Sequence, residues 1–201
     1  MKKRSAKKGL LFVVSGPSGS GKTTLVTELL QESGVRRKLV RSRSFTTRPP
    51  RSGERHNKDY LFISEEHFRR QRKAKKILEW IKYLGYYYGT PKDFLEAELA
   101  KGRNVVLCLD LEGTHKVRRL YPDNTVTIFV LPPSLEALRE RIERRCHKTA
   151  KDEINKRLAR ARRELSAATR YDYRLVNKNF NQVLKRLKRI VLRKINQAAE
   201  R

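Results

Sequence analysis

A glycine-rich run that ends in Lys22 and Thr23 is the first part of the chain whose residue types could do chemistry. Its glycines let the backbone curl so that successive N–H groups face phosphate oxygens, and the lysine neutralises charge on β- and γ-phosphates. The Thr23 hydroxyl is expected to reach Mg²⁺. The alternative is a turn that carries a lysine by coincidence, and the full pattern arises by chance in about one chain in a hundred. The run predicts a nucleotide-phosphate site built from Gly16, Pro17, Ser18, Gly19, Ser20, Gly21, Lys22, Thr23 and Thr24.

A second group of phosphate-binding side chains follows in a proline-stiffened loop. Arg48 and Arg51 lie three residues apart, and Tyr60 comes shortly after them. Guanidinium forks bind a phosphate bidentately, and a tyrosine hydroxyl completes the contacts to its oxygens. A solvated arginine loop on a basic protein is an equally good interpretation of these residues taken alone.

The elements that must position these groups follow from apolar periodicity. Four runs of β-forming residues alternate with helical stretches, and they are Leu10–Val14, Tyr60–Ile63, Val105–Leu109 and Val126–Leu131. The first run leads into the glycine loop, and a helix over Thr23–Leu30 follows the loop. This alternation predicts an α/β fold with a mostly parallel sheet flanked by helices. Helix starts are expected at Ser64, Ser134 and Asp152, and helix ends at Gly34 and Gly102.

Two segments interrupt the alternation, residues 42–92 and residues 134–169. The first is rich in Arg, Tyr, Pro and Gly. It contains two short strands, Ile77–Trp80 and Tyr86–Tyr88, around a turn, which predicts a small antiparallel sheet. The second is nearly all helical and very basic. Insertions into an α/β core commonly carry substrate loops and lids, so we expect both segments to serve the phosphate site.

Composition limits the classes of protein to consider. The chain has 201 residues, of which 38% are hydrophobic, so it can form one compact domain and a three-domain protein is excluded. It carries 49 Lys and Arg against 21 Asp and Glu, a formal net charge of +28. This excess favours polyanionic partners such as nucleotides, nucleic acid or anionic membranes, and charge alone does not choose among them.

Cysteine usage and the N-terminal residues bear on compartment. Cys108 and Cys146 show no CxxC spacing, so neither a disulfide framework nor a structural metal site is indicated, and a reducing cytoplasmic compartment fits best. The apolar run after the basic N-terminal residues is shorter than a signal peptide requires. Other apolar stretches fall well short of a membrane span of about 20 residues, so we expect a soluble protein without a membrane partner.

Seven blocks of the sequence, in this order, resemble guanylate kinases over nearly the whole chain. They are GPSGSGKTT (residues 16–24), SRSFTTRPPRSGERHNKDY (42–60), LEWIKYLGYYYGT (78–90), DLEG (110–113), LPPS (131–134), INKRL (154–158) and YDYRLVN (171–177). The resemblance implies a P-loop core, a small mixed α/β GMP-binding insertion and a helical lid. It also implies phosphorylation of GMP and dGMP by ATP with Mg²⁺, in a monomer or homodimer.

The implied division of the chain has five parts. Residues 1–41 form core with a basic N-terminal tail and the P-loop, residues 42–92 the GMP-binding insertion, residues 93–133 core, residues 134–169 the lid, and residues 170–201 core.

The resemblance also assigns roles to individual residues. Those implied to bind GMP are Ser44, Arg48, Arg51, Glu54, Tyr60, Glu79, Tyr88, Thr90 and Asp110. Within this set, Ser44, Glu79 and Thr90 are the implied guanine contacts, because a carboxylate accepts from both N1–H and the 2-amino group of guanine and is left unpaired by adenine. The implied catalytic residues are Lys22, Arg48 and three lid arginines, Arg141, Arg145 and Arg157. Asn177 is implied to contact the adenine side of ATP.

Three features depart from the family pattern. Cys108 stands where an acidic residue is common, which leaves Asp110 as the remaining carboxylate at the end of that strand. Glu112 replaces a common glutamine, and the lid loop at residues 144–147 has lost two glycines. Most of the other basic residues of the lid region are expected to form a solvated helical face. This set is Arg139, Arg144, Lys148, Lys151, Lys156, Arg160, Arg162 and Arg163.

Three other functions fit the sequence less well. A catalytically weak guanylate-kinase-like module that binds phosphorylated peptides has no need of Lys22 and Thr23, which are intact. A phosphosugar kinase of the same fold would not require Ser44 and Glu79. Nucleic-acid binding lacks a base-reading motif, so specific binding is not expected and non-specific binding of polyanions is a side property of the charge.

Overall fold

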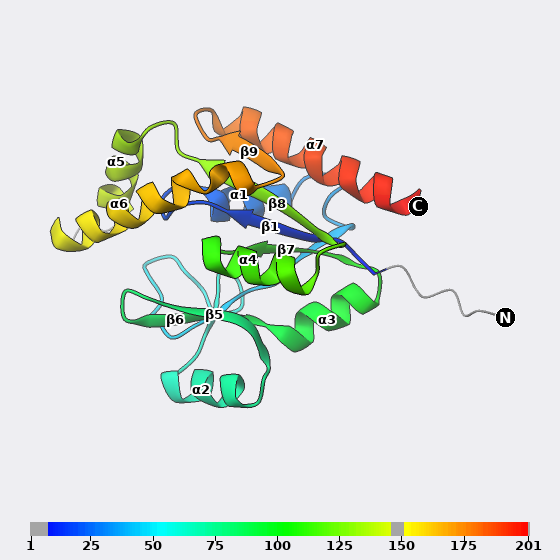
Figure 1. The fold of residues 1–201 in the computed structure, drawn as a ribbon, viewed down its shortest axis with the longest axis horizontal. Coiled ribbons are helices and arrows are strands. Elements are labelled where there is room, and N and C mark those ends of the chain that lie inside the picture. Colours follow the sequence, from blue (N-terminus) through cyan, green and yellow to red (C-terminus); the bar gives the residue numbers. More distant parts are fainter. Residues whose placement is uncertain (1–7, 146–150, 201) are drawn as a thin grey trace.

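The computed structural model describes residues 8–145 and 151–200, and its core is a five-stranded parallel sheet (Figure 1). The strand order is β2-β7-β1-β8-β9, with every pairing parallel. The strands are β1 (Leu11–Ser15), β2 (Leu39–Arg41), β7 (Asn104–Cys108), β8 (Thr125–Leu131) and β9 (Tyr173–Val176). The central strand β1 is buried along its whole length, as its continuous apolar sequence requires when helices cover both faces. The predicted α/β fold class is confirmed.

Successive residues of β1 point to opposite faces of this sheet, and each face packs against its own helices. On one face, Phe12 and Val14 belong to an apolar cluster with residues of α1 (Lys22–Leu29) and α7 (Phe180–Ala199). On the other, Leu11 and Val13 cluster with residues of α3 (Lys92–Ala100) and α4 (Leu111–Leu120). Figure 1 shows the sheet between these two helical layers.

A second, smaller sheet lies below the core in Figure 1 and has the order β4-β3-β6-β5. Its strands are β3 (Phe45–Thr46), β4 (Leu61–Phe62), β5 (Ile77–Tyr83) and β6 (Tyr86–Pro91), and the helix α2 (Glu65–Lys73) lies between β4 and β5 in the sequence. The hairpin of β5 and β6 is antiparallel and turns at Leu84 and Gly85, which both have positive φ, as a two-residue hairpin turn requires. The predicted hairpin is confirmed. The apolar run 60–63 forms only the two-residue strand β4, which pairs parallel with β3.

The third part is a pair of helices, α5 (Leu135–Arg145) and α6 (Lys151–Ser166), followed by the 3₁₀ turn η1 (Ala168–Arg170). These helices share a small apolar cluster that includes Leu138 and Ile142 of α5 and Ile154 of α6. In Figure 1 they lie at one end of the molecule, beyond the ends of the core strands.

Most of the helix boundaries expected from the sequence are confirmed. The side chain of Ser64 accepts from the backbone N–H of His67 and that of Ser134 from Ala137, each at 3.1 Å. Gly102 follows the last turn of α3 with a φ of 73°. Asp152 lies inside the first turn of α6 rather than before it. The expected helix end at Gly34 is wrong, because α1 already ends at Leu29 and a series of turns fills the interval.

Within residues 8–145 and 151–200, no helix is both long enough and apolar enough to cross a bilayer.

Candidate functional site

A cleft of about 610 Å³ lies where the core, the small sheet and the helical pair meet. Most of the residues singled out from the sequence line it: Gly16, Ser18, Gly19, Gly21, Lys22, Thr23, Thr24, Ser44, Arg48, Arg51, Glu54, Tyr60, Glu79, Tyr88, Asp110, Arg141 and Arg157. Four others, Pro17, Ser20, Thr90 and Asn177, are not part of the lining. The side chain of Arg145 lies outside the described residues.

The glycine loop joins the end of β1 to the start of α1, and its shape depends on two of its glycines. A β-carbon on Gly16 would lie 2.4 Å from the Val130 carbonyl oxygen, and one on Gly21 would lie 2.4 Å from Asn177 Nδ2. Gly21 also has a φ of 90°, which side-chain-bearing residues rarely adopt. The Lys22 ammonium donates to the Gly16 carbonyl at 2.9 Å, so it lies across the loop that it was expected to serve.

Asn177 is buried and braces this loop from the end of β9. Its side-chain Nδ2 donates to the Ser20 backbone carbonyl at 2.8 Å, and its backbone carbonyl accepts from Arg141 Nη2 at 3.1 Å. Asn177 therefore links the glycine loop to α5. The position of Asn177 thus fixes both the glycine loop, through Ser20, and the side chain of Arg141.

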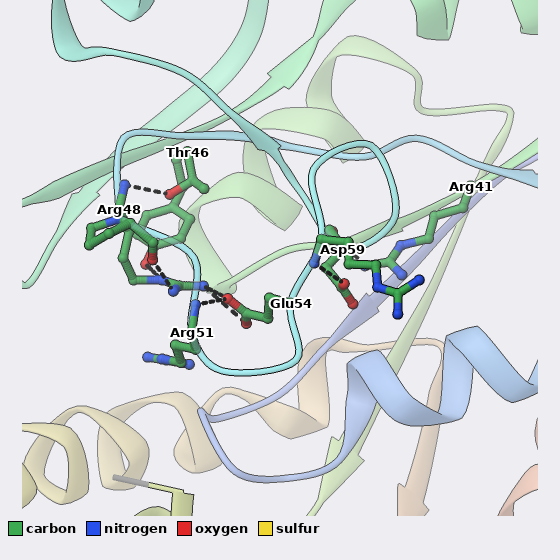
Figure 2. Close-up of polar contacts among 9 residues, drawn as sticks. Arg41, Thr46, Arg48, Arg51, Glu54 and Asp59 are labelled. Atoms are coloured by element: carbon green, nitrogen blue, oxygen red, sulfur yellow. Dashed lines mark hydrogen bonds and ion pairs between the residues drawn. The ribbon is translucent and has the colours of Figure 1, made fainter. Parts of the chain in front are cut away.

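The proline-stiffened loop folds around a buried ion pair between Arg48 and Glu54. Arg48 Nη2 donates to Glu54 Oε2 at 2.8 Å, and Arg48 Nε donates to the Tyr88 hydroxyl at 3.2 Å. Glu54 Oε2 also accepts from the backbone N–H of Arg51 at 2.9 Å. Figure 2 shows Arg48 and Glu54 facing each other across the loop, with Arg51 beside them. This arrangement rules out a freely solvated arginine loop.

Opposing effects act on the Glu54 carboxyl. Burial pushes its pKa upward, but the hydrogen bonds from Arg51 and Arg48 outweigh burial, so the pKa lies below its ordinary value. Tyr60 meets Tyr88 edge to face with ring centroids 6.0 Å apart, and the Arg48 guanidinium lies 5.7 Å from the Tyr60 ring centroid. The result is a rigid cluster of cations and phenols on the wall of the cleft opposite the glycine loop.

Glu79 is a buried carboxylate on β5, with only 4% of its surface exposed. Its Oε1 accepts from the Thr90 hydroxyl of β6 at 2.6 Å. A β-carbon on Gly113 would lie 2.9 Å from Glu79 Oε2, so the carboxylate packs against the first turn of α4 where glycine leaves room. Burial raises the pKa of Glu79 to about 7, and the nearby charge of Asp110 acts in the same direction.

Asp110 lies at the end of β7 and caps α4, since its Oδ1 accepts from the backbone N–H of Gly113 at 2.8 Å. Its Oδ2 accepts from Arg160 Nη2 of α6 at 2.7 Å. Arg160 is an exception to the solvated face expected for most of these basic residues, because its side chain reaches into the cleft. No sequence signal separates it from Arg163, which follows at the same three-residue spacing on this helix and is exposed. The expectation holds for Arg139, Arg144, Lys156, Arg162 and Arg163, which are exposed.

The two other arginines of α5 and α6 that line the cleft are also held by hydrogen bonds. Arg157 is buried, and its Nε donates to Glu153 of the same helix at 3.0 Å. Arg141 is tied to the Asn177 carbonyl as described above. Lys148 and Cys146 fall outside the described residues, as do the side chains of Arg145 and Lys151.

Cys108 lines the floor of the cleft at the end of β7. Burial raises the pKa of its thiol, while the charges of Arg41 and Lys22 act in the opposite direction. The position therefore faces the site and also packs against the apolar core. The cleft has further lining residues that the sequence analysis did not single out, namely Thr27, Glu28, Asp59, Ile81, Tyr83, Gly89, Leu109, Arg160, Ala161 and Glu164.

The donor set bears on how a magnesium ion would be held. Among the described residues, no group of three or more His, Cys, Asp and Glu side chains is arranged to hold a metal. Thr23 lines the cleft, and its hydroxyl is a hard oxygen donor of the kind that Mg²⁺ prefers. This set fits an Mg²⁺ ion that enters with nucleotide phosphates, because Mg²⁺ usually keeps few protein ligands in such sites.

Comparisons with known proteins agree with this geometry. A family model described as guanylate kinase matches residues 8–194. The guanylate kinase of Wolbachia pipientis wMel is 42% identical over 183 residues, which are 91% of this chain and 89% of that protein. The guanylate kinase of Caldanaerobacter subterraneus subsp. tengcongensis is 41% identical over 92% of this chain and 88% of its own. A crystal structure of the guanylate kinase from Anaplasma phagocytophilum covers 96% of this chain and 89% of its own with a TM-score of 0.77 and 30% identity.

Proposed function

The chain belongs to the guanylate kinase family, whose members are ATP:GMP phosphotransferases, and we propose the parts that its own residues take in that reaction. The insertion, residues 42–92, holds GMP and the glycine loop holds ATP. The lid, residues 134–169, closes over both. The observation that carries this assignment is that a buried carboxylate, an arginine and tyrosine cluster and the phosphate loop line one cleft.

Glu79 recognises guanine. Its carboxylate accepts from guanine N1–H and the 2-amino group, with the Thr90 hydroxyl holding one oxygen in place at 2.6 Å. Ser44 lines the same cleft and completes the base contacts. Adenine has no donor at N1, so AMP would leave this buried carboxylate without its partners, and a buried group left unpaired costs about 1 to 3 kcal/mol or more.

The GMP phosphate binds to the cluster around Arg48. Glu54 orients Arg48 with its guanidinium held from two sides, and Tyr60, Tyr88 and Arg51 supply the remaining donors. A cluster that is already rigid loses little conformational freedom when the phosphate arrives. GMP is thereby fixed with its phosphate toward the glycine loop.

Phosphoryl transfer needs positive charge around the γ-phosphate more than it needs covalent chemistry. Lys22 moves from the Gly16 carbonyl to the phosphates of ATP, and Arg141, Arg145 and Arg157 bring charge from the lid. Asn177 keeps the loop and α5 in register on the adenine side. Thr23 would hold Mg²⁺ together with the ATP phosphates, and the ion would neutralise negative charge on those phosphates that otherwise repels the attacking GMP oxygen.

We further propose a cytoplasmic protein that acts on GMP and dGMP as a monomer or homodimer. The free Cys108 thiol supports a reducing compartment, and Glu79 and Ser44 read the base rather than the ribose. An interaction module for phosphorylated peptides is not supported, since the matching proteins are kinases and the phosphate loop keeps Lys22 and Thr23.

One coupled phosphotransfer assay tests these assignments. ATP and Mg²⁺ are supplied with GMP, dGMP, AMP, UMP or CMP, and the ADP released is measured. We expect turnover with GMP and dGMP and a kcat/KM for AMP lower by about 10³ or more. Equal turnover of AMP and GMP would contradict the guanine assignment, and no turnover of any nucleotide would favour the interaction module.

A further inference from the structure

Arg160 of α6 contacts two other parts of the molecule at once. Its Nη2 donates to Asp110 Oδ2 at 2.7 Å, at the end of a core strand. Its guanidinium lies 4.7 Å from the ring centroid of Tyr83, at the end of β5 in the insertion. Its Nε donates to Glu164 Oε1 of the same helix at 2.9 Å, which fixes the direction of the side chain. One lid residue therefore meets both the core and the insertion.

Asp110 connects Arg160 to the guanine-reading carboxylate. A β-carbon on Gly113 would lie 3.1 Å from Asp110 Oδ1 and 2.9 Å from Glu79 Oε2, so both carboxylates face the same first turn of α4. Two neighbouring negative charges disfavour each other's ionised form. The charge on Asp110 therefore opposes the ionised state of Glu79, which is the state that accepts two hydrogen bonds from guanine.

Other groups around Glu79 set the balance. The Thr90 hydroxyl on β6 and the positive charge of Lys116 on α4 favour its ionised form, whereas burial and Asp110 oppose it. Arg160 is the cation that pairs directly with Asp110 among the described residues. Removal of Arg160 therefore exposes Glu79 to more of the Asp110 charge.

We propose that Arg160 is a positioning residue through which closure of the lid prepares Glu79 to bind guanine. This inference rests on the proposed function of the cleft. With the lid closed, Arg160 offsets the charge of Asp110 and holds the end of β5 through Tyr83, four residues from Glu79 on the same strand. Because coupling between two equilibria is reciprocal, GMP bound to Glu79 favours the closed lid to the same degree.

The test compares three variants of the whole protein by steady-state kinetics from pH 6 to pH 8.5. Arg160→Gln removes the charge, Arg160→Lys keeps it, and Arg163→Gln removes a charge from an exposed residue of the same helix that has no ion pair among the described residues. We expect Arg160→Gln to raise KM for GMP about tenfold at pH 7, to leave KM for ATP within about twofold, and to move the midpoint of the pH profile of KM for GMP upward. Arg160→Lys and Arg163→Gln should keep the wild-type midpoint.

An Asp110→Asn background separates coupling from simple support of the lid. There the charge that Arg160 offsets is absent, so adding Arg160→Gln should leave the midpoint where it is. The proposal is overturned if Arg160→Gln leaves the midpoint unchanged in the wild-type background, or if it raises KM for ATP and GMP equally. Failure of the proposed function would look different, because the unsubstituted protein would then not phosphorylate GMP at all.

Discussion

Because we propose that Glu79 recognises guanine, we expect the Michaelis constant for GMP to depend on pH in a range where most carboxylates are already ionised. With a pKa of about 7 in the protein without GMP, roughly ten in eleven Glu79 side chains are ionised at pH 8 and roughly one in eleven at pH 6. If only the ionised form accepts from guanine, KM for GMP is about tenfold higher at pH 6 than at pH 8, which corresponds to about 1.4 kcal/mol. Saturating GMP selects the ionised form, so kcat should change little through this group.

The measurement is KM for GMP at half-unit intervals from pH 6 to pH 8.5, at constant ionic strength because of the net charge of +28. The phosphate of GMP also titrates near pH 6, as monoester phosphates do, so a control is needed. Glu79→Gln keeps the size of the side chain and removes its titration. The variant should have a higher KM overall and should retain only the phosphate component of the profile.

Parallel pH profiles in the wild type and in Glu79→Gln would refute the reasoning. So would a wild-type KM for GMP that is flat from pH 6.5 to pH 8, because the carboxylate would then be ionised throughout. KM for ATP, measured in the same series, should not follow the Glu79 profile.

Four further outcomes are expected. The raised pKa of Glu79 means that the folded protein keeps this proton above pH 4.5, so the stability contributed by this group is lost as pH rises through about 7. The free energy of unfolding in urea should fall by up to about 3 kcal/mol from pH 5 to pH 8, and Glu79→Gln should remove this decline. An unchanged decline in the variant would count against the raised pKa of Glu79. Arg51→Ala should raise KM for GMP by about 10², whereas Arg157→Ala should lower kcat by a similar factor, and wild-type turnover in the second variant would show that its role is wrong. Cys108→Asp adds a carboxylate to the cleft floor and should lower the Mg²⁺ concentration for half-maximal rate, whereas a loss of melting temperature alone would mark the residue as purely structural. Gly21→Ala places a β-carbon 2.4 Å from Asn177 Nδ2 at a φ of 90°, so it should weaken ATP binding and lower the melting temperature, and ATP affinity equal to wild type would contradict the packing of this loop.

The core and the phosphate loop could be predicted from the sequence because their signals are local. Strand β1 is a continuous apolar run, and the spacing from Gly16 to Thr23 specifies its own backbone shape. The hairpin of β5 and β6 could be predicted from the β-forming residues on both sides of Gly85. Strands β3 and β4 have two residues each, which is too short for any periodicity to register.

Contacts between distant residues could not be predicted. Arg160 pairs with Asp110 across 50 positions, and Asn177 reaches Ser20 across 157. A basic helix of this composition looks the same in sequence whether a given arginine faces water or a carboxylate. Resemblance to a known family suggested the roles that we propose for Glu79 and Thr90. It gave no indication of Arg160, because only the packing of α6 against the core reveals this contact.

The central position of β1 has a consequence for how the protein is made. Leu11 pairs with Val105 on one side and with Thr125 on the other, so this strand gains its neighbours only after about a hundred further residues have been synthesised. At synthesis rates of about 5 to 20 residues per second, its apolar side chains wait for roughly 5 to 20 seconds without the sheet that later buries them. The glycine loop attached to β1 therefore takes its final shape late, and until then the exposed apolar residues of this strand favour aggregation.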